Sequence, residues 1–580
     1  MAHDLIIRGG TVVDGTGQPS FTADLAVNGG VITAIDPTGK IGGGAIREID
    51  ADGLLVTPGW VDVHTHYDGQ VSWDSQLAPS SIHGVTSVVM GNCGVGFAPA
   101  SSGADSHELL ISLMEGVEDI PGAALHEGLT WDWQSYPEYL DALARRAYKI
   151  DVGSQIPHSA LRTFVMGERG ADYHENPTQA EIAEMTRLVA EGLEAGAMGF
   201  ATSRTVNHRS RTGQKIGTLT AEAAEILGIA EALALTGKGV MQFVSDFKDI
   251  DAELGLMRAA SERAGGRPIS VSLAQADRSP DHWRRVLDWI SKAAAEGVDF
   301  KAQCAPRTIG LLVGLESTMN PFLRTATYKA TLMDLPLEER VRRMGQPEVR
   351  AALLAEAPEA RGGLFKMAGG NADRIFRLGE PANYEPAPEQ SLGAEARRLG
   401  RDPFDVVYDA LLERDGRELL YFPLANYAGG TMEAAREMLL HDRTIPGLSD
   451  GGAHVSFISD ASFPTFLLTH WCRDRTRGER LPLEFVVKRQ THDTARHVGW
   501  NDRGVLAPGY LADINVIDLA NLTLHAPQMI HDLPAGGKRL MQHADGYVAT
   551  IKRGQITFDN GKPTEALPGA LQRGAQPAPV

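Results

Sequence analysis

Cysteine is scarce in this sequence, and long apolar runs are absent. Only three of the 580 residues are cysteine, at Cys93, Cys304 and Cys472. An odd number at such wide spacing provides no disulfide framework and fits a reducing compartment. No stretch approaches the roughly 20 apolar residues that span a bilayer, and the N-terminus lacks the basic start and apolar core of a secretory leader. These absences predict a cytoplasmic protein.

Positive charge is also in short supply. The chain has 55 Lys and Arg residues against 74 Asp and Glu, which gives a formal net charge of −19. This balance argues against nucleic acid and against anionic membrane surfaces as partners. A small-molecule substrate of either charge remains compatible with it, because a local basic pocket can exist in an acidic protein. The length predicts one large domain with a smaller satellite, and it leaves the oligomeric state, including a homo-oligomer, open.

The two ends of the chain have the texture of short strands joined by tight turns. Residues 5–55 consist of apolar runs separated by Asn-Gly and Asp-Gly pairs, which are strong hairpin signals. The same texture returns between residues 513 and 557. Neither segment is large enough to be stable alone, so we expect residues 1–57 and 505–565 to form one small β-sandwich domain. Residues 566–580 read as a flexible tail.

Between these ends, apolar strands alternate with helical patterns. Several intervals have helical periodicity, namely residues 180–194, 221–235 and 282–295. Eight strand–helix units predict an α/β fold, a (β/α)₈ TIM barrel over residues 58–504, with its chemistry at the carboxyl ends of the strands. An open, doubly wound sheet is the alternative, although no glycine-rich phosphate-binding motif follows the first strand. The eight candidate strands lie at 54–63, 86–90, 149–153, 196–200, 239–244, 268–273, 298–303 and 444–448.

Residues 332–400 interrupt this alternation. The segment is charged and helix-prone, so we interpret it as an insertion before the last strand–helix unit. It either covers the mouth of the pocket or simply extends the surface.

Four polar residues lie at the ends of predicted strands that would be neighbours in a closed barrel. His64 and His66 are two residues apart, so on a strand both imidazoles point to the same side. Cys93 comes just after the second strand, and Asp450 just after the eighth. Such a set can bind one divalent cation such as zinc, which lowers the pKa of water, while a carboxylate moves its proton. Buried core histidines, a buried thiol and a turn aspartate are the alternatives.

Four motifs occur in order along the chain, at Thr57–His66, Gly91–Gly94, Leu448–His454 and Gly509–Asp518. Together they resemble the amidohydrolase superfamily, specifically its D-aminoacylase (N-acyl-D-amino-acid deacylase) branch, which the cysteine after the second strand selects. The resemblance implies that His64, His66 and Asp450 surround one metal position, that Cys93 serves a metal and that Asp450 is the proton shuttle. It implies a metal-dependent hydrolase of a C–N amide bond.

One departure from the family pattern concerns the metal. Family members usually supply one histidine from strand five and one from strand six, whereas here residues 242–247 and 270–275 contain none. Asp246 and Gln275 are the nearest polar candidates. We therefore expect one zinc ion, and we leave a second ion open.

Several other residues are candidates for holding the substrate. A substrate carboxylate needs a cation, and Arg204 or Arg307 could clamp it with two hydrogen bonds, unless each forms a structural ion pair instead. His208 and His158 could donate to a scissile carbonyl, although such histidines are more often ordinary loop residues. Three further candidates are the neighbouring Ser203, the weaker candidate Asn426, and His454, which would hydrogen-bond into the site without binding the metal.

Three functions are compatible with these residues. The first is hydrolysis of an N-acyl (D-)amino acid or a similar small amide by metal-activated water. The second is hydrolysis of a cyclic amide, an ester or a lactone on the same barrel. The third is a non-catalytic relative, which the missing histidines of strands five and six motivate.

Overall fold

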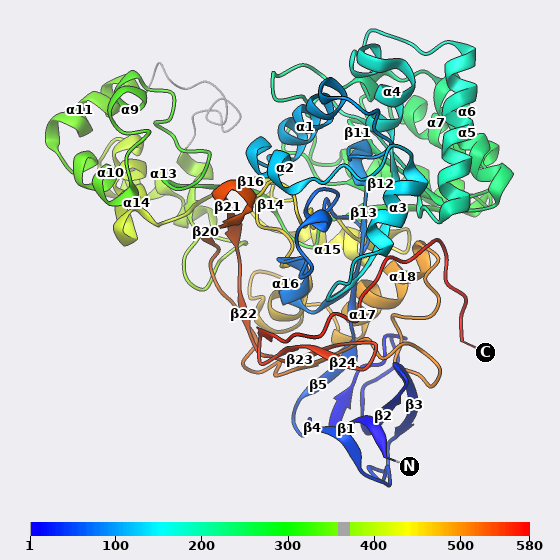
Figure 1. Ribbon diagram of the computed structural model, residues 1–580. Helices are drawn as coiled ribbons and strands as arrows, with labels where there is room; N and C mark the ends of the chain where they lie inside the picture. Colours follow the sequence, from blue (N-terminus) through cyan, green and yellow to red (C-terminus); the bar gives the residue numbers. More distant parts are fainter. Residues whose placement is uncertain (1, 358–371, 580) are drawn as a thin grey trace.

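The computed structural model describes residues 2–357 and 372–579, and its centre consists of parallel strands (Figure 1). Six strands form one sheet and three form a second, and every pairing within them is parallel. Most side chains of these strands are buried, as expected for strands covered on both faces. The strands are β6 (Trp60–Asp62), β7 (Val85–Met90), β8 (Asp151–Ser154), β9 (Ile156–Pro157), β10 (Gly199–Arg204), β11 (Val240–Ser245), β12 (Ile269–Leu273), β13 (Phe300–Cys304) and β17 (Thr444–Pro446).

The two parallel sheets meet at both of their edges. Only Gln155 separates β8 from β9, so these two segments continue one strand from one sheet into the other. At the opposite edge, Thr65 and Gly451 form an isolated parallel bridge just beyond β6 and β17. The strands therefore follow one another in chain order, and the last lies beside the first. The predicted strands at 86–90, 149–153, 196–200, 239–244, 268–273, 298–303 and 444–448 are found within a few residues.

The predicted first strand, residues 54–63, is two strands in the structure. β5 (Leu55–Pro58) belongs to the sheet formed by the chain ends, and β6 belongs to the parallel strands. Gly59 lies between them, where a Cβ atom would come within 2.3 Å of the Thr86 side chain. A glycine thus lets the chain pass closely from one sheet to the other.

Helices connect the parallel strands in the order that the sequence predicts. The periodic segments at 180–194, 221–235 and 282–295 are the helices α5 (Gln179–Ala195), α6 (Ala223–Thr236) and α8 (His282–Ala295). α5 begins at a capping box in which Thr178 and Glu181 satisfy each other's backbone N–H groups. It ends at Gly196, whose φ of 112° suits glycine.

Strands from both chain ends form one nine-stranded sheet. The order is β25-β24-β23-β18-β5-β1-β2-β3, and β4 pairs with the first part of β1 while β5 pairs with its last two residues. The two ends meet where β5 pairs with β18 in an antiparallel register. The remaining strands are β1 (His3–Val12), β2 (Phe21–Asn28), β3 (Val31–Asp36), β4 (Ala45–Asp50), β18 (Ile514–Ile517), β23 (Tyr547–Lys552), β24 (Gln555–Asp559) and β25 (Lys562–Pro563).

A buried charge cluster joins this sheet to the parallel strands. Asp151, at the start of β8, contacts Lys552 and Arg503 at 2.7 Å each, and all three side chains are at most 1% exposed. These cations outweigh the effect of burial and hold the pKa of Asp151 below its ordinary value of 3.8. The stabilisation is therefore complete above about pH 4, and it is lost as the pH falls below that value.

Replacing Asp151 with asparagine is expected to destabilise the fold by about 3–5 kcal/mol, because it removes the carboxylate that two buried cations share and leaves each of them with one other carboxylate partner. The shift of the urea midpoint measures this loss. The control is Asp559→Asn, since Asp559 pairs with Arg47 on the surface and should matter by less than about 1 kcal/mol. Equal shifts of the urea midpoint in the two variants would show that the buried cluster stabilises the fold no more than the surface ion pair does.

The insertion is longer than the sequence predicts. It was expected at residues 332–400, but the departure from the parallel strands begins at β14 (Ile309–Val313) and ends with β16 (Leu420–Ala425), which pair with each other. The segment has its own apolar core and projects to the upper left in Figure 1. Residues 358–371 lie outside the described residues. Its helices are α9 (Ala326–Thr331), α10 (Leu337–Met344), α11 (Pro347–Glu356), α13 (Leu392–Leu399) and α14 (Pro403–Gly416), and β15 (Phe376–Arg377) completes its sheet.

The C-terminal segment is not the flexible tail that its composition predicts. The backbones of Tyr148 and Gly569 exchange two hydrogen bonds, and Gln572 donates to the carbonyl of Val152. Gly569 permits this contact, because a Cβ atom there would lie 2.2 Å from the Ile150 carbonyl oxygen. Backbone pairing across a long sequence separation thus orders a segment that is poor in apolar side chains.

Among the helices of the described residues, none combines the length and the apolar character needed to cross a bilayer.

Candidate metal centre

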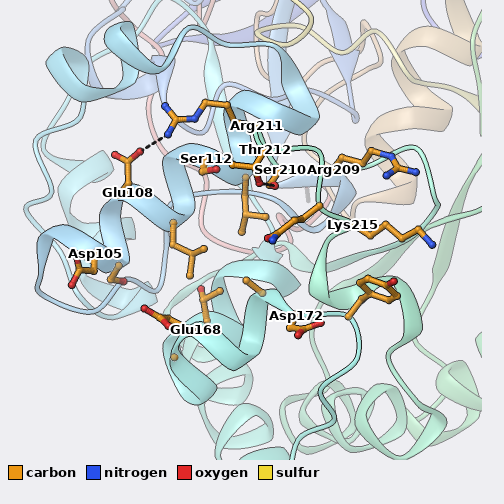
Figure 2. Close-up of a pocket in the computed structure, with 18 of the residues that line it drawn as sticks. Asp105, Glu108, Ser112, Glu168, Asp172, Arg209, Ser210, Arg211, Thr212 and Lys215 are labelled. Atoms are coloured by element: carbon orange, nitrogen blue, oxygen red, sulfur yellow. Dashed lines mark hydrogen bonds and ion pairs between the residues drawn. The ribbon is translucent and has the colours of Figure 1, made fainter. Parts of the chain in front are cut away.

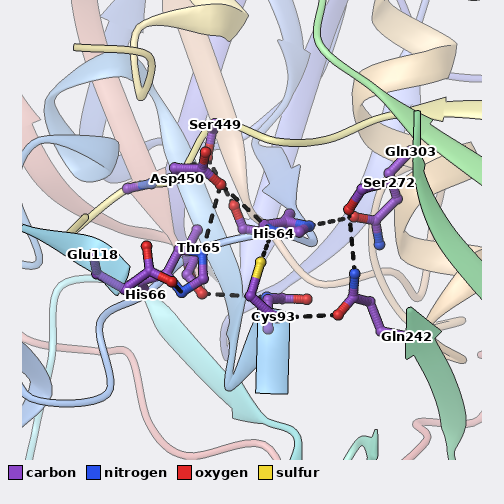
Figure 3. Close-up of polar contacts among 12 residues, drawn as sticks. His64, Thr65, His66, Cys93, Glu118, Gln242, Ser272, Gln303, Ser449 and Asp450 are labelled. Carbon is purple, nitrogen blue, oxygen red and sulfur yellow. Dashed lines mark hydrogen bonds and ion pairs between the residues drawn. The ribbon is translucent and has the colours of Figure 1, made fainter. Parts of the chain in front are cut away.

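Two histidines and an aspartate meet just beyond the strands that close the parallel sheets. His64 Nε2 lies 3.4 Å from Asp450 Oδ1, and His66 Nε2 lies 3.5 Å from the same oxygen (Figure 3). Both imidazoles are at most 1% exposed, whereas the Asp450 side chain is 20% exposed and so remains within reach of a substrate. The backbone N–H of Asp450 donates to the His64 carbonyl at 3.2 Å, which fixes this arrangement.

Cys93 approaches the same point from the end of β7. It lies in a short 3₁₀ turn over Asn92–Gly94 with a φ of 55°, and its Sγ is 3.4 Å from His64 Nε2. Asp450 also has a positive φ, of 49°. Non-glycine residues adopt this conformation at a cost of about 1–2 kcal/mol each, and such strain is concentrated at functional sites. The donor atoms of His64, His66 and Cys93 all lie within 4.8 Å of one another.

Gln303 holds the outer nitrogen of His64. Its Oε1 is 2.5 Å from His64 Nδ1, and its own amide donates to Ser270 Oγ at 2.6 Å. With a carbonyl oxygen at Nδ1, the hydrogen belongs on Nδ1 and the lone pair of Nε2 points toward Asp450 and Cys93. No sequence motif indicated Gln303. The only local signal is an amide near the carboxyl end of β13.

The protonation of the centre follows from burial and from nearby charge. Burial lowers the pKa of His64 to about 4, so this imidazole is neutral. Burial alone would raise the pKa of Asp450, but the hydrogen bond with His66 and the charges of the histidines outweigh it and hold the pKa below its ordinary value. Burial raises the pKa of Cys93 to about 12, so a thiolate there needs an added cation.

These residues fit a divalent cation such as zinc. Two imidazole nitrogens, a thiol and a carboxylate are the donors that zinc prefers, with bonds of about 2.0–2.3 Å. Donors that share one such ion lie about 3–4.6 Å apart by that geometry, and the three distances of 3.4, 3.4 and 3.5 Å agree with it. The buried His66 Nδ1 has no hydrogen-bond partner among the described residues.

β11 and β12, the fifth and sixth parallel strands, contribute amides and hydroxyls to this region. Gln242 Oε1 accepts the backbone N–H of Cys93 at 3.1 Å, and its amide reaches Ser272. The two candidates named from the sequence have other partners. Asp246 accepts from Thr205 and from the backbone of Val206, and Gln275 bonds to backbone groups of nearby loops.

Glu118, a further residue that no sequence motif indicated, lies beside His66 on the side of Nδ1. It is the last residue of α1 (Ala104–Glu118), and its Oε1 is 3.3 Å from His66 Nδ1. Burial raises its pKa above the ordinary value. His454, which was expected to hydrogen-bond into the site without binding the metal, contacts Glu118, with Nε2 3.6 Å from Oε2. No sequence pattern marked Glu118, since a carboxylate at a helix C-terminus has no favourable local role.

Neither arginine proposed for the substrate carboxylate is free in the structure. Arg204 forms a two-point ion pair with Glu253, with both distances 2.9 Å. Arg307 is fully buried, stacks on Tyr384 and pairs with Asp460 at 2.8 Å. The structural alternative for each arginine therefore describes it better, because each already has a carboxylate partner within the fold.

His158 and Asn426 are likewise held within the fold. His158 lies between Thr202 and Glu225, at 2.8 and 2.9 Å, with no exposed surface. Asn426 is also fully buried, accepts the backbone N–H of Gln275 and donates to the Arg307 carbonyl. Both were predicted to touch substrate, but their polar atoms are already occupied.

Ser203 and His208 remain beside the centre. Ser203 Oγ is 2.8 Å from His208 Nδ1. Burial, together with the charges of His454 and His66, lowers the pKa of His208 to about 3, so its imidazole is neutral. The effect of these two histidines indicates that His208 lies near the centre.

A cavity of about 970 Å³ opens next to this region (Figure 2). The loop that carries His208 continues as a hairpin whose residues 209–215 form one wall, and α1 forms another. None of the four donor residues lines the cavity, so it lies beside the centre and not over it.

Comparison with known proteins gives one family. The model described as the amidohydrolase family matches residues 47–558. A D-aminoacylase of Alcaligenes xylosoxydans xylosoxydans is 26% identical, covering 90% of this chain and 89% of that protein. The N-acyl-D-aspartate deacylase of the same organism is also 26% identical, covering 98% and 97%. The solved N-acyl-D-glutamate deacylase from Bordetella bronchiseptica, complexed with zinc and a phosphonate inhibitor, has a TM-score of 0.63 at 24% identity, with 99% of this chain and 100% of that chain covered. The resemblance drawn from the four sequence motifs is thus confirmed, and the chain belongs to the amidohydrolase family.

Proposed function

We propose that this protein is a metal-dependent hydrolase that cleaves the C–N amide bond of an N-acyl D-amino acid. The observation that carries the proposal is the meeting of His64, His66, Cys93 and Asp450, which come from the first, second and last parallel strands. The relatives matched over most of their length support the substrate class, because one is named a D-aminoacylase and the other an N-acyl-D-aspartate deacylase. The substrate is therefore a small molecule.

The cofactor that we propose is one zinc ion. His64, His66, Cys93 and Asp450 would hold it, and the bound ion would supply Lewis acidity that activates water and polarises the acyl carbonyl. The amides and hydroxyls at Gln242, Ser270 and Ser272 take the place where family members usually supply histidines, so a second, histidine-held ion is not part of the proposal.

Asp450 moves the proton in the proposed reaction. Its lowered pKa keeps it ionised at neutral pH, so its oxygen can accept a proton from the attacking water. The same carboxyl then gives that proton to the departing nitrogen, which leaves as an amine. The partial exposure of Asp450 allows both transfers.

His208 and Ser203 supply the second part of the mechanism. If Ser203 donates its hydroxyl hydrogen to His208 Nδ1, the hydrogen of the neutral ring lies on Nε2. Nε2 can then donate to the acyl oxygen as negative charge develops on it. The lowered pKa of His208 keeps the ring in this neutral form.

The architecture that we propose is a closed (β/α)₈ barrel with a β-sandwich built from the two chain ends. The bridge between Thr65 and Gly451 supports closure, because it places the last strand beside the first. The domain bounds remain those proposed from the sequence, apart from the longer insertion and the ordered C-terminal segment. We also place the protein in the cytoplasm, since its three cysteines are all unpaired.

A panel of substrates tests the proposed function. Release of free amine should be fastest from N-acetyl or longer N-acyl D-amino acids, and slower by about 10-fold or more from their L-enantiomers and from cyclic amides and lactones. The metal-loaded wild-type chain is assayed at equal substrate concentrations. Faster turnover of a cyclic amide, ester or lactone would favour the alternative hydrolase, which the relatives do not favour.

A further inference from the structure

Glu118 is a carboxylate enclosed by the candidate centre without an arginine or a lysine to neutralise it. Its side chain is 2% exposed, and its ion-pair contacts within the described residues are to two imidazoles. Oε1 lies 3.3 Å from His66 Nδ1, and Oε2 lies 3.6 Å from His454 Nε2. Glu118 and Gln303 flank the two histidines from opposite sides (Figure 3).

The polar atoms around this carboxylate are left without hydrogen bonds. Glu118 Oε1, His66 Nδ1 and His454 Nδ1 are all buried and form no hydrogen bond among the described residues, although the first two lie 3.3 Å apart. A buried, unsatisfied polar atom costs about 1–3 kcal/mol, and more for a charged group. The position at the C-terminus of α1 is unfavourable as well, because the helix dipole presents partial negative charge there. Neither the helix nor the local packing gains from this carboxylate.

The two metal-facing histidines differ in what holds their outer nitrogens. His64 Nδ1 meets a neutral amide oxygen from Gln303, whereas His66 Nδ1 faces the carboxylate of Glu118. A metal-bound histidine commonly donates its other N–H to a carboxylate, which fixes the ring and makes the ligand more basic. We propose that Glu118 is a positioning residue that accepts the Nδ1 hydrogen of His66, and thereby strengthens a metal site that lacks the histidines of strands five and six. This inference rests on the proposed function.

Two neighbouring segments hold Glu118 in place. On one side, the hairpin after β10 docks on α1, since Arg211 donates its backbone N–H to the Ser112 carbonyl at 2.9 Å. Gly116 makes this docking close, because a Cβ atom there would lie 2.1 Å from the backbone of Ser210. On the other side, the backbone N–H of His454 donates to the Glu118 carbonyl. The backbone that carries the Glu118 side chain is thus fixed from both directions.

The test compares zinc affinity in Glu118→Gln and in a matched control. The amide keeps the size of the side chain but removes its charge, so we expect zinc to bind about 10–100-fold more weakly, as measured by competition with a chromogenic chelator. We also expect a shifted visible spectrum in the cobalt-loaded protein. The control is Asp119→Asn, which removes the adjacent carboxylate and suits the positive φ of 53°. It should bind zinc within about 2-fold of the wild type.

Each result bears on the inference separately from the proposed function. Wild-type zinc affinity and an unchanged cobalt spectrum in Glu118→Gln would overturn it, and so would an equal loss in Asp119→Asn. If Glu118→Gln does not fold, Glu118→Asp retains the charge but withdraws it from His66, and it should still weaken zinc binding. A wild-type chain that binds no zinc would instead refute the proposed function itself.

Discussion

Replacing Asp450 with asparagine is expected to lower kcat by about 10²–10⁴-fold, the usual contribution of a positioned acid or base. The amide has nearly the same size, so the strand ends around it should stay in place. It cannot accept the proton of the attacking water, however, and it cannot return that proton to the departing nitrogen. The measurement is steady-state turnover of an N-acyl D-amino acid at saturating zinc.

A matched control separates this role from a general loss of negative charge. Asp246 follows β11 and uses its carboxylate to accept from Thr205 and from the backbone of Val206. Asp246→Asn should therefore leave kcat within about 3-fold of the wild type. Unchanged turnover in Asp450→Asn, with full metal occupancy, would remove Asp450 from the mechanism.

Removal of the metal is expected to abolish hydrolysis while leaving the chain folded. The centre lies at the ends of strands whose side chains pack in a large apolar core, so the fold does not depend on an added ion. Dialysis against a strong chelator should lower turnover by about 10²-fold or more, and zinc should restore it. Circular dichroism before and after dialysis checks that the secondary structure is kept.

The double variant His64→Asn and His66→Asn provides the control for metal removal. Zinc should not restore turnover in this variant, because two of the proposed ligands are gone. An apoprotein that retains full turnover in the presence of chelator would contradict the proposed cofactor.

The strands and helices that the sequence predicted are those that depend on local residue patterns. Apolar runs bounded by glycine and helices with capping residues depend on neighbours in the chain, so their positions were found within a few residues. The meeting of His64, Cys93 and Asp450 followed from strand order, because parallel strands in sequence bring their carboxyl ends to one side. The predicted strand order was therefore sufficient to place residues almost 400 positions apart in the sequence close together in the fold.

The parts that the sequence did not predict depend on single contacts between distant side chains. Gln303 reaches His64 across 239 residues, and nothing near either residue marks the other. Arg204 and Arg307 have the charge that a substrate carboxylate requires, but only the folded chain reveals Glu253 and Asp460 as their partners. The C-terminal segment was misjudged for a related reason, since it is ordered by backbone hydrogen bonds that composition does not report.

The most direct test of the account is X-ray absorption of the zinc-loaded chain at the zinc edge. We predict one sulfur ligand at about 2.3 Å and two imidazole nitrogens at about 2.0–2.1 Å, with the sulfur signal lost in Cys93→Ser. A zinc environment of oxygen ligands alone, without sulfur or imidazole, would place the ion elsewhere and contradict the account.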